Sequence, residues 1–582
     1  MAIAFVAGGR RWLAAAGAVQ GLALWLLFES WPQQVMAAAG FAAACAFIGV
    51  ASLVMHMAWT GQAFGRLAAT SAVVGGVAAA VTFSVASGLP PTGTVLAQGD
   101  ETLVISWLFV LAILLYVSGP YLQIWQRTGV ARFAYSDLYR HAWSNAFIVA
   151  LAQLHVGVLW LVLELWAGLF RLLGIKVFGD LFHEKVFLFT VTGAALGYGL
   201  AAARENERLL DSLRGITQAL LRAILPLAAL VTIGFLTTLC FTGLDLLFAT
   251  QRTATLLQAW IAVYILLLNG VYLDGSQQPP YSAPLRVLVE TATLLLTVLA
   301  AIAGHALWLR IDEYGLTPDR VFAAALLFVL SMYSISYAAA VIARGQPWLP
   351  RLRGANVGMS AVVIVVGLAL HTPLLDPLAL SLGNQLARLS GGRVTEDRFD
   401  YAALRFSLGQ RGNAALQDLA EAAATDTGRA RVAQALQVSS YWEWQRVEGA
   451  VGEARVFWRV PPESPWPDGL EPVLQREYVA DERIRCTDDQ PCYVIDGDVD
   501  LDGKLEALVV SSTAMHSMQV FRKDGGEAWK RLGTFGLRHS RSDMPLDLEG
   551  WARSVREGKL RVVEPLFGDL MVGERRYLLH PE

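Results

Sequence analysis

The sequence predicts an α-helical polytopic membrane bundle of about eleven spans, followed by a small α+β domain. Hydrophobic residues make up 55% of the 582 residues, and charged residues only 16%. Apolar stretches long enough to cross a bilayer follow one another as far as Leu375, and residues 376–582 contain no further stretch of this kind. About 20 helical residues cross the hydrocarbon of a bilayer. Backbone polar groups in lipid must be hydrogen-bonded within their own segment, so we expect helices rather than strands.

The predicted spans are separated by short polar segments. Each span is a run of about 18 or more mostly apolar residues. The eleven runs are Trp12–Phe28, Val35–Trp59, Leu67–Leu89, Leu103–Trp125, Phe147–Leu169, Val186–Ala203, Ala223–Phe241, Leu256–Leu273, Val287–Leu309, Val321–Ala343 and Val357–Leu375.

The distribution of basic residues predicts which end of the chain lies on which side of the membrane. Lysine and arginine concentrate in cytoplasmic loops. With the N-terminus in the cytoplasm, 14 arginines fall in cytoplasmic segments and 6 basic residues fall on the other side. Three of those six lie in the stretch 171–185, which reads as an amphipathic surface helix. An odd number of spans then places the C-terminal residues outside, which in a bacterium with two membranes means the periplasm.

Ionisable residues inside predicted spans are candidates for function, because each is costly to bury in lipid. Four of them form a candidate intramembrane polar site: His155, Glu164, Glu290 and His305. His56 and His371 lie nearer to span ends. The structural interpretation is that each hydrogen-bonds a neighbouring helix. The functional alternative is a path for protons or a substrate.

The segment between the ninth and tenth spans is the densest polar motif of the membrane half. Thr317 is suited to cap the tenth helix, with Pro318 in its first turn and Asp319 near its positive end. Four charged side chains beside the bilayer need another explanation: Arg310, Asp312, Glu313 and Arg320. They could pair with one another, dock the C-terminal region, or bind a lipid head group.

Two stretches resemble one known family. The first is Arg-Ile-Asp-Glu-Tyr-Gly-Leu-Thr-Pro-Asp-Arg at 310–320, and the second runs from Asp376 to Gly412, with Asp-Pro, Ala-Arg-Leu, Phe-Asp-Tyr and Gly-Gln-Arg-Gly along it. Both are similar to bacterial multi-span proteins of the domain of unknown function 4153. The resemblance implies a topology and no reaction, and it carries over no catalytic residues.

The polar region divides into a helical part and a β-rich part. We expect a transmembrane domain over residues 1–375, short helices over 376–440, and a β-rich domain over 441–582. Strand candidates include Tyr493–Ile495, Ala507–Ser511 and Leu560–Val563. Cys486 and Cys492 flank a polar turn, and in an oxidising compartment they are expected to form a disulfide.

An acidic loop, Asp-Gly-Asp-Val-Asp-Leu-Asp-Gly-Lys-Leu-Glu at 496–506, follows the cysteines. Calcium prefers six to eight oxygen ligands. The loop resembles the short calcium loop of β-propeller (FG-GAP-type) repeats, in a single copy. That match implies the side chains of Asp498, Asp500, Asp502 and Glu506 as ligands, with the carbonyl of Lys504. The alternative is an acidic hairpin turn whose charges are solvated. We expect a structural calcium ion.

No motif in the sequence states an activity. The chain has no glycine-rich phosphate loop, nucleophile elbow or zinc-protease motif, so whether it is an enzyme is undecided. Neither half has the basic stripe that nucleic acid requires. Our preferred hypothesis is an inner-membrane protein that acts in envelope assembly or signalling through a periplasmic protein partner. The alternatives are a transporter or lipid flippase, and a membrane-embedded transferase on a lipid-linked substrate.

Overall fold

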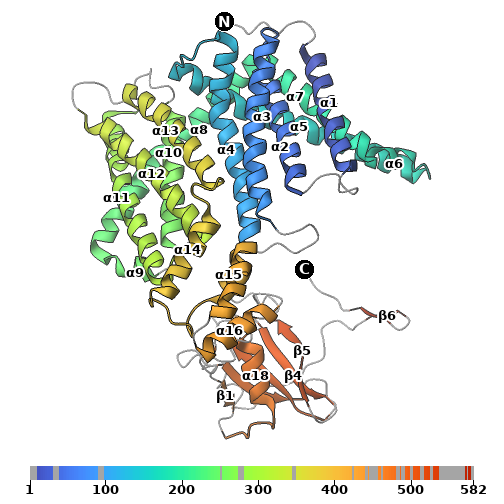
Figure 1. The fold of residues 1–582 in the computed structure, drawn as a ribbon, viewed down its shortest axis with the longest axis vertical. Coiled ribbons are helices and arrows are strands. Elements are labelled where there is room, and N and C mark those ends of the chain that lie inside the picture. Colours follow the sequence, from blue (N-terminus) through green and yellow to red (C-terminus); the bar gives the residue numbers. More distant parts are fainter. Residues whose placement is uncertain are drawn as a thin grey trace. The chain divides into compact units, whose positions relative to one another are not determined.

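The computed structural model divides the chain into two compact units, residues 1–432 and 433–582. Each unit is described by itself (Figure 1). The structure describes residues 9–30, 38–89, 98–249, 252–272, 281–343, 349–422, 425–438, 444, 457–460, 463–479, 486, 492–498, 503–511, 517–524, 528–536, 570–572 and 575–577.

Eleven helices in the described residues are long and apolar enough to cross a membrane, which confirms the predicted polytopic architecture. They are α1 (Gly9–Ser30), α2 (Ala38–Ala58), α3 (Phe64–Ser87), α4 (Gln98–Thr128), α5 (Tyr135–Leu172), α7 (Lys185–Glu205), α8 (Glu207–Thr242), α10 (Thr253–Tyr272), α11 (Ala283–Tyr314), α12 (Pro318–Ile342) and α13 (Leu349–Leu370).

Several helices extend beyond the predicted apolar runs, such as α5 and α8 at their N-terminal ends, and two other boundaries have a local cause. The last span was expected to end at Leu375, but α13 ends at Leu370. The chain turns before Pro373, because proline disfavours helical geometry in the residue preceding it. The expected surface helix over 171–185 is also shorter. Residue 172 still belongs to α5, Gly174 has a positive φ of 81°, and only Val177–His183 forms the separate helix α6.

Helices α1 and α7 pack through glycines spaced four residues apart. A Cβ atom on Gly17 would lie 2.0 Å from the carbonyl oxygen of Gly193, and one on Gly197 would lie 2.2 Å from that of Leu13. Only glycine allows backbones to approach this closely, which is the usual function of small residues at four-residue spacing in membrane helices. We did not anticipate this contact from the sequence.

The second half of the bundle is built around α11. Its buried face includes Val289, Leu296 and Leu299, which are fully enclosed by α8, α10 and α12. The Tyr264 hydroxyl on α10 donates to the Val289 carbonyl of α11 at 3.0 Å. A buried tyrosine hydroxyl usually finds such a partner, and here it ties two apolar helices together.

Several helices follow the last span within the first unit. They are α14 (Pro377–Ser390), the π-helical turn η2 (Ala403–Ser407), α15 (Gly409–Ala422) and most of α16 (Asp426–Gln437). Figure 1 shows α15 beyond the end of α4, and the two helices are in contact. The division into two units therefore groups α14 and α15 with the spans. The predicted domain bounds at 375 and 440 stay predictions.

The second unit contains the sheet that the sequence predicts. Strands β1 (Phe457–Val460), β2 (Cys492–Gly497), β3 (Glu506–Ser511), β4 (Ser517–Asp524) and β5 (Ala528–Gly536) form one sheet in chain order. β1 and β2 are parallel, and the other neighbours are antiparallel. Helix α18 (Leu470–Val479) contributes to the same hydrophobic core as β2 and β3. Strands β6 (Leu570–Val572) and β7 (Arg575–Tyr577) form a separate pair, and the predicted strand Leu560–Val563 lies outside the described residues.

Candidate functional site

The segment that joins α11 to α12 turns sharply at Gly315. This residue has a φ of 78°, and a Cβ there would lie 2.7 Å from Gln385 Nε2 and 3.0 Å from Asn384 Oδ1. Glycine is therefore required both by the backbone and by the neighbouring helix. Thr317 then caps α12 as predicted, because its hydroxyl accepts from the Arg320 amide at 3.4 Å.

Helix α14 binds this turn with three side chains that act on its main chain. Asn384 Oδ1 accepts from the Leu316 amide at 2.8 Å. Gln385 Nε2 donates to the carbonyls of Tyr314 and Leu316, at 3.0 and 2.9 Å. Because these partners are backbone groups, the contact depends on the main-chain conformation of the turn and not on its side chains.

Arg388 completes the contact at the C-terminal end of α11. Its Nη1 and Nη2 atoms donate to the carbonyls of Asp312 and Glu313, each at 2.8 Å, and the residue is only 9% exposed. The last carbonyls of a helix lack partners within the helix and carry a partial negative charge. The buried guanidinium of Arg388 supplies both hydrogen-bond donors and a positive charge to these carbonyls.

Three of the four predicted charged side chains of this segment, those of Arg310, Glu313 and Arg320, contact other groups of the chain. Arg310 forms an ion pair with Glu313 at 3.3 Å and donates to the Phe248 carbonyl at 3.2 Å. Arg320 donates to the Gly315 carbonyl at 2.6 Å and lies over the Tyr314 ring, 5.4 Å from its centroid. Asp312 contributes its main-chain carbonyl to Arg388.

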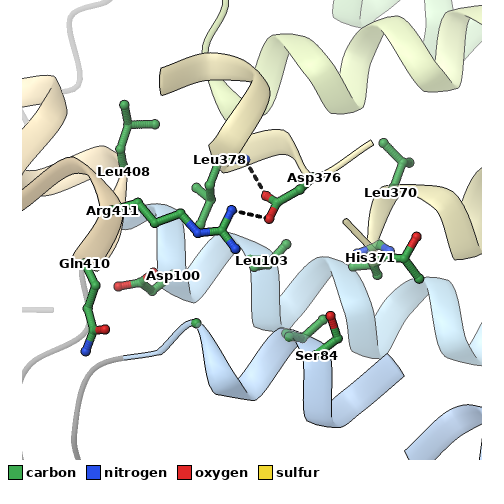
Figure 2. A pocket seen from close by; sticks show the side chains of 13 residues that line it. Ser84, Asp100, Leu103, Leu370, His371, Asp376, Leu378, Leu408, Gln410 and Arg411 are labelled. Carbon is green, nitrogen blue, oxygen red and sulfur yellow. Dashed lines mark hydrogen bonds and ion pairs between the residues drawn. The ribbon is translucent and has the colours of Figure 1, made fainter. Parts of the chain in front are cut away.

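A pocket lies beside this contact, where α3, α4 and α13 meet α14 and α15 (Figure 2). Asp376 caps α14, because one carboxylate oxygen accepts from the amides of Leu378 and Ala379 at 3.0 and 3.3 Å. Figure 2 shows Arg411 of α15 directed at the same carboxylate, with which it forms an ion pair. One aspartate therefore joins the helix after the last span to the next helix.

Asp100 of α4 lies buried against the start of α15. It is 1% exposed, and a Cβ on Gly409, the first residue of α15, would lie 2.1 Å from its Oδ1 atom. The φ of Gly409 is 61°. A carboxylate is favourable at the positive N-terminal end of a helix. The glycine gives this carboxylate access, and Gly99 likewise lets the backbone of Ser407 approach α4.

His371 is the buried polar group on the membrane side of the pocket. Its Nδ1 lies 3.0 Å from the Gly367 carbonyl, and its Nε2 lies 3.1 Å from Ser106 Oγ. In the neutral ring, Nδ1–H donates to the carbonyl and Nε2 accepts from the serine hydroxyl. Burial lowers the pKa of His371, whereas the Gly367 hydrogen bond and the charge of Asp376 oppose this shift.

The size of the pocket limits what it can do. Its volume is about 20 Å³, which is room for about one water molecule. A substrate does not fit in this conformation. The buried charges and the close glycine contacts therefore connect the ends of the spans to the helices α14 and α15. We call this region the joint.

The four candidate residues of the intramembrane site each have a different neighbour. His155 packs on the Tyr198 ring, and His305 lies between the rings of Phe248 and Trp308. A carboxylate oxygen of Glu164 lies 3.6 Å from His183 Nε2 of α6, and Glu290 pairs with Arg286 one turn away at 3.4 Å. These contacts lie in separate parts of α5 and α11. A common polar site made of these four residues stays a prediction.

Sequence reasoning missed an uncharged polar network inside the bundle. Asn356 Nδ2 lies 2.7 Å from Asn269 Oδ1 and 2.6 Å from the Tyr135 hydroxyl, and the Tyr337 hydroxyl bonds to both asparagines. The network joins α5, α10, α12 and α13. The signal was present, because asparagine is costly in lipid without a partner. We considered only ionisable residues.

The second unit holds the cysteines and part of the acidic loop. Cys486 and Cys492 form a disulfide with an S–S distance of 2.02 Å, as predicted. Asp496 pairs with both terminal nitrogens of Arg459, a side chain only 3% exposed, so this carboxylate is used outside the loop.

The predicted calcium ligands are described only in part. Asp498 Oδ2 accepts from the Gly503 amide at 3.0 Å, and Glu506, which is fully buried, lies opposite Gly497 in the β2–β3 pair. Lys504 is described, whereas Asp500 and Asp502 lie outside the described residues. No cluster of three or more His, Cys, Asp or Glu suited to a metal occurs among the described residues alone. The calcium ion stays a prediction.

Comparison with known proteins gives one match. The model of the family described as Domain of unknown function (DUF4153) matches residues 36–419. The match begins just before α2 and ends within α15, so it includes the turn at Gly315 and the helix α14 that binds it. No curated protein matches, and no solved structure matches.

Proposed function

The chain belongs to the family described as Domain of unknown function (DUF4153), and on that basis we propose that its membrane half is a rigid mount for an extracytoplasmic module. The family region continues past the last span and includes α14 and most of α15. In this proposal the mount sits in the bacterial inner membrane, with the N-terminus in the cytoplasm. It presents the C-terminal unit in the periplasm to a protein partner in envelope assembly or signalling.

One observation carries the proposal: α14 holds the α11–α12 turn through main-chain hydrogen bonds. Asn384, Gln385 and Arg388 together make five such bonds within 3.0 Å. Hydrogen bonds to a charged donor contribute about 1.5–3 kcal/mol each, more than neutral ones. A helix fixed in this way transmits its position to the residues that follow it, which is what a mount requires.

The contacts within the membrane half favour this function over the two alternatives. A transferase would need the charges of residues 310–320 to be available to a substrate, yet Arg310, Glu313 and Arg320 bond to groups of the chain itself. Transport through the spans would be supported by polar groups that converge on one path. His155 and Glu164 instead contact side chains of α7 and α6. Glu290 and His305 contact Arg286 and Trp308 on their own helix, α11.

The proposed orientation is tested by a reporter fused after residue 582. We expect an alkaline phosphatase fusion, which folds only where disulfides form, to be active in cells. A green fluorescent protein fusion at the same position is expected to be dark after Sec export. The reverse pattern would place the C-terminal unit in the cytoplasm and would remove the basis for a periplasmic partner.

The proposed partner is tested by photo-crosslinking in cells. A photoreactive residue replaces Trp458 on β1, which is 51% exposed. We expect a discrete crosslinked protein, and we expect Arg388→Ala to weaken it by changing how the module is held. Arg393→Ala is the matched control, because Arg393 is exposed and follows the same helix. Absence of any discrete product from several exposed positions on the sheet would contradict the proposal.

We further propose a structural calcium ion in the loop 498–506. Asp498, Asp500, Asp502 and Glu506 would supply carboxylates, with the carbonyl of Lys504. Glu506 is fully buried and lies at the end of the β2–β3 pair that the loop joins, and calcium prefers carboxylate oxygens among its ligands. Extracellular modules of this kind bind calcium at about 10⁻⁴–10⁻³ M.

Terbium luminescence of the full-length protein tests this site. We expect calcium to displace terbium in the wild type, and we expect Glu506→Gln to lose the signal. Asp468→Asn, at an exposed aspartate before α18, is the control and should retain it. An unchanged signal in Glu506→Gln would show that the loop is a solvated acidic turn.

A further inference from the structure

An apolar pocket of about 320 Å³ lies among α2, α4 and α5, apart from the joint described above. Ligand pockets in proteins have volumes of roughly 300–1,000 Å³. Its walls include Leu53 of α2, Leu115 of α4 and Val149 of α5. It is therefore large enough for part of a small molecule, and apolar enough for a hydrocarbon chain.

The mouth of the pocket opens on the outer surface of the bundle. Tyr116 is 45% exposed and Val149 is 38% exposed, and the small residues Ala112 and Ala146 beside them are also exposed. All four belong to helices that are long and apolar enough to span a membrane. In a bilayer this surface faces lipid, so lipid chains are the molecules that reach the mouth directly.

One end of the pocket is polar. Gln123 Nε2 donates to Asn145 Oδ1 at 2.9 Å, and Asn145 Nδ2 donates back to Gln123 Oε1 at 3.1 Å. Asn145 is 7% exposed. Asn145 lines the pocket, and its amide nitrogen carries two hydrogens, of which one bonds to Gln123. Gly119 lies beside this nitrogen without a side chain, and a Cβ there would be in van der Waals contact with it, at 3.5 Å.

The apolar runs of the sequence place the polar end near the surface of the bilayer. Asn145 lies just before the run Phe147–Leu169, and Gln123 lies close to the end of the run Leu103–Trp125. Three tryptophans lie near the corresponding ends of the apolar runs: Trp59, Trp125 and Trp143. Tryptophan concentrates at membrane–water interfaces. The apolar walls therefore extend toward the middle of the bilayer from a donor placed near the ester groups of a phospholipid.

We propose that this pocket binds one acyl chain of a glycerophospholipid, with the ester carbonyl accepting from Asn145. The apolar walls suit a hydrocarbon chain, and the amide donor favours a lipid with an ester carbonyl over a lipid without one. The proposal does not depend on the mount function, because the pocket lies among spans and not at the joint with α14 and α15.

The test uses a phosphatidylglycerol with a photoreactive diazirine on one acyl chain, incorporated into vesicles with the full-length protein. After irradiation, labelled peptides are identified by mass spectrometry. We expect label on residues 53–58, 112–123 and 146–149. Ala146→Phe and Ala112→Phe place a ring at the mouth, in the space that the acyl chain would take, so we expect label at these positions to fall about tenfold.

The matched control is Ala301→Phe, which adds the same ring to an exposed alanine of α11. Its labelling of the pocket should equal that of the wild type, and thermal melting checks that each variant is folded. Two mouth variants keep the test decisive if one of them fails to fold. Label that is spread evenly over the spans, or that survives both filling variants, would overturn the proposal.

A second probe separates the sources of a hydrocarbon chain. A photoreactive polyprenyl phosphate has the hydrocarbon chain but no carboxylic ester carbonyl, so we expect it to label the pocket less than the phospholipid does. Equal or stronger labelling by the polyprenyl probe would show that the pocket selects a chain without regard to the ester, and the glycerophospholipid assignment would be wrong.

Discussion

At the scale of single residues, two glycines with the same backbone geometry have opposite surroundings. Gly409 and Gly392 have φ values of 61° and 69°. A Cβ on Gly409 would lie 2.1 Å from Asp100 Oδ1, whereas a Cβ on Gly392 would meet nothing within 4 Å. The pair therefore separates the cost of the left-handed backbone from the cost of displacing the buried carboxylate.

We expect Gly409→Ala to destabilise the protein more than Gly392→Ala does. A non-glycine residue in the left-handed region costs about 1–3 kcal/mol at either position. Only Gly409→Ala also pushes Asp100 away from the start of α15. Thermal melting of the purified protein in detergent measures the difference. Equal melting temperatures would mean that Asp100 does not hold α15.

His371 makes a prediction about pH, because it lies in the joint and its ring is buried. Burial lowers its pKa below the ordinary value of 6.5. Between the lowered pKa of His371 in the folded protein and its ordinary value of 6.5, the unfolded chain binds a proton that the folded protein does not. The stability of the protein therefore rises with pH across this window. The groups facing the ring include Ser106, Gly367 and the carboxylate of Asp376.

We expect the wild type to lose stability as pH falls from about 7.5 through 6.5, and the loss to level off below the folded pKa. His371→Gln keeps a polar side chain that does not titrate, so its melting temperature should fall less over the same range. Parallel pH profiles for the two proteins would show that His371 does not change protonation in this window.

At the scale of elements, the glycines between α1 and α7 decide how closely these helices approach. Gly17 and Gly193 each face the other's carbonyl oxygen, and Gly21 faces that of Phe189. We expect Gly17→Leu to separate the two helices and to lower the melting temperature, because a large side chain in a closed contact costs about 1–3 kcal/mol or more. Gly76→Leu is the control, since a Cβ there would meet nothing within 4 Å.

A disulfide between cysteines placed on facing turns of α1 and α7 gives a second measure of how closely the two helices approach. Oxidation should form the crosslink readily in the wild-type background and slowly with Gly17→Leu. If Gly17→Leu and Gly76→Leu lower the melting temperature equally, the close approach of α1 and α7 contributes no special stability.

The sequence predicted the elements better than it predicted their contacts. Hydropathy alone locates all eleven spans, because lipid imposes length and composition on a helix. The cap of α12 at Thr317 follows from local chemistry and is observed. The end of α13 was placed five residues too late, since Thr372 and Pro373 stop the helix while the apolar run continues to Leu375.

Contacts between distant segments could not be read from one sequence. Arg388 is 76 residues from the Asp312 carbonyl that it binds, and no local pattern encodes that pairing. The charges of residues 310–320 drew attention to the turn, yet its main chain makes the contact with α14. The four candidate residues of the intramembrane site were chosen by charge, while the network at Asn356 was overlooked because its members are neutral.

At the scale of the whole molecule, the division into two units predicts that they respond separately to reduction. Cys486 and Cys492 both lie in the hydrophobic core of the second unit. A disulfide that closes a short loop stabilises a fold by about 2 kcal/mol, mainly by restricting the unfolded chain. The loss should therefore be confined to residues 433–582.

We expect the double variant Cys486→Ser, Cys492→Ser to expose the second unit to proteolysis while the spans stay intact. Limited proteolysis of the full-length protein should leave a protected fragment that ends near residue 432 and release shorter peptides from the rest. The thiols at Cys45 and Cys240 serve as the control, because both are free and lie in spans of the first unit. Replacing them with serine should leave proteolysis of the second unit unchanged. If loss of the disulfide melted both units together, the two would fold as one cooperative body, and a module carried on an independent mount would no longer describe this protein.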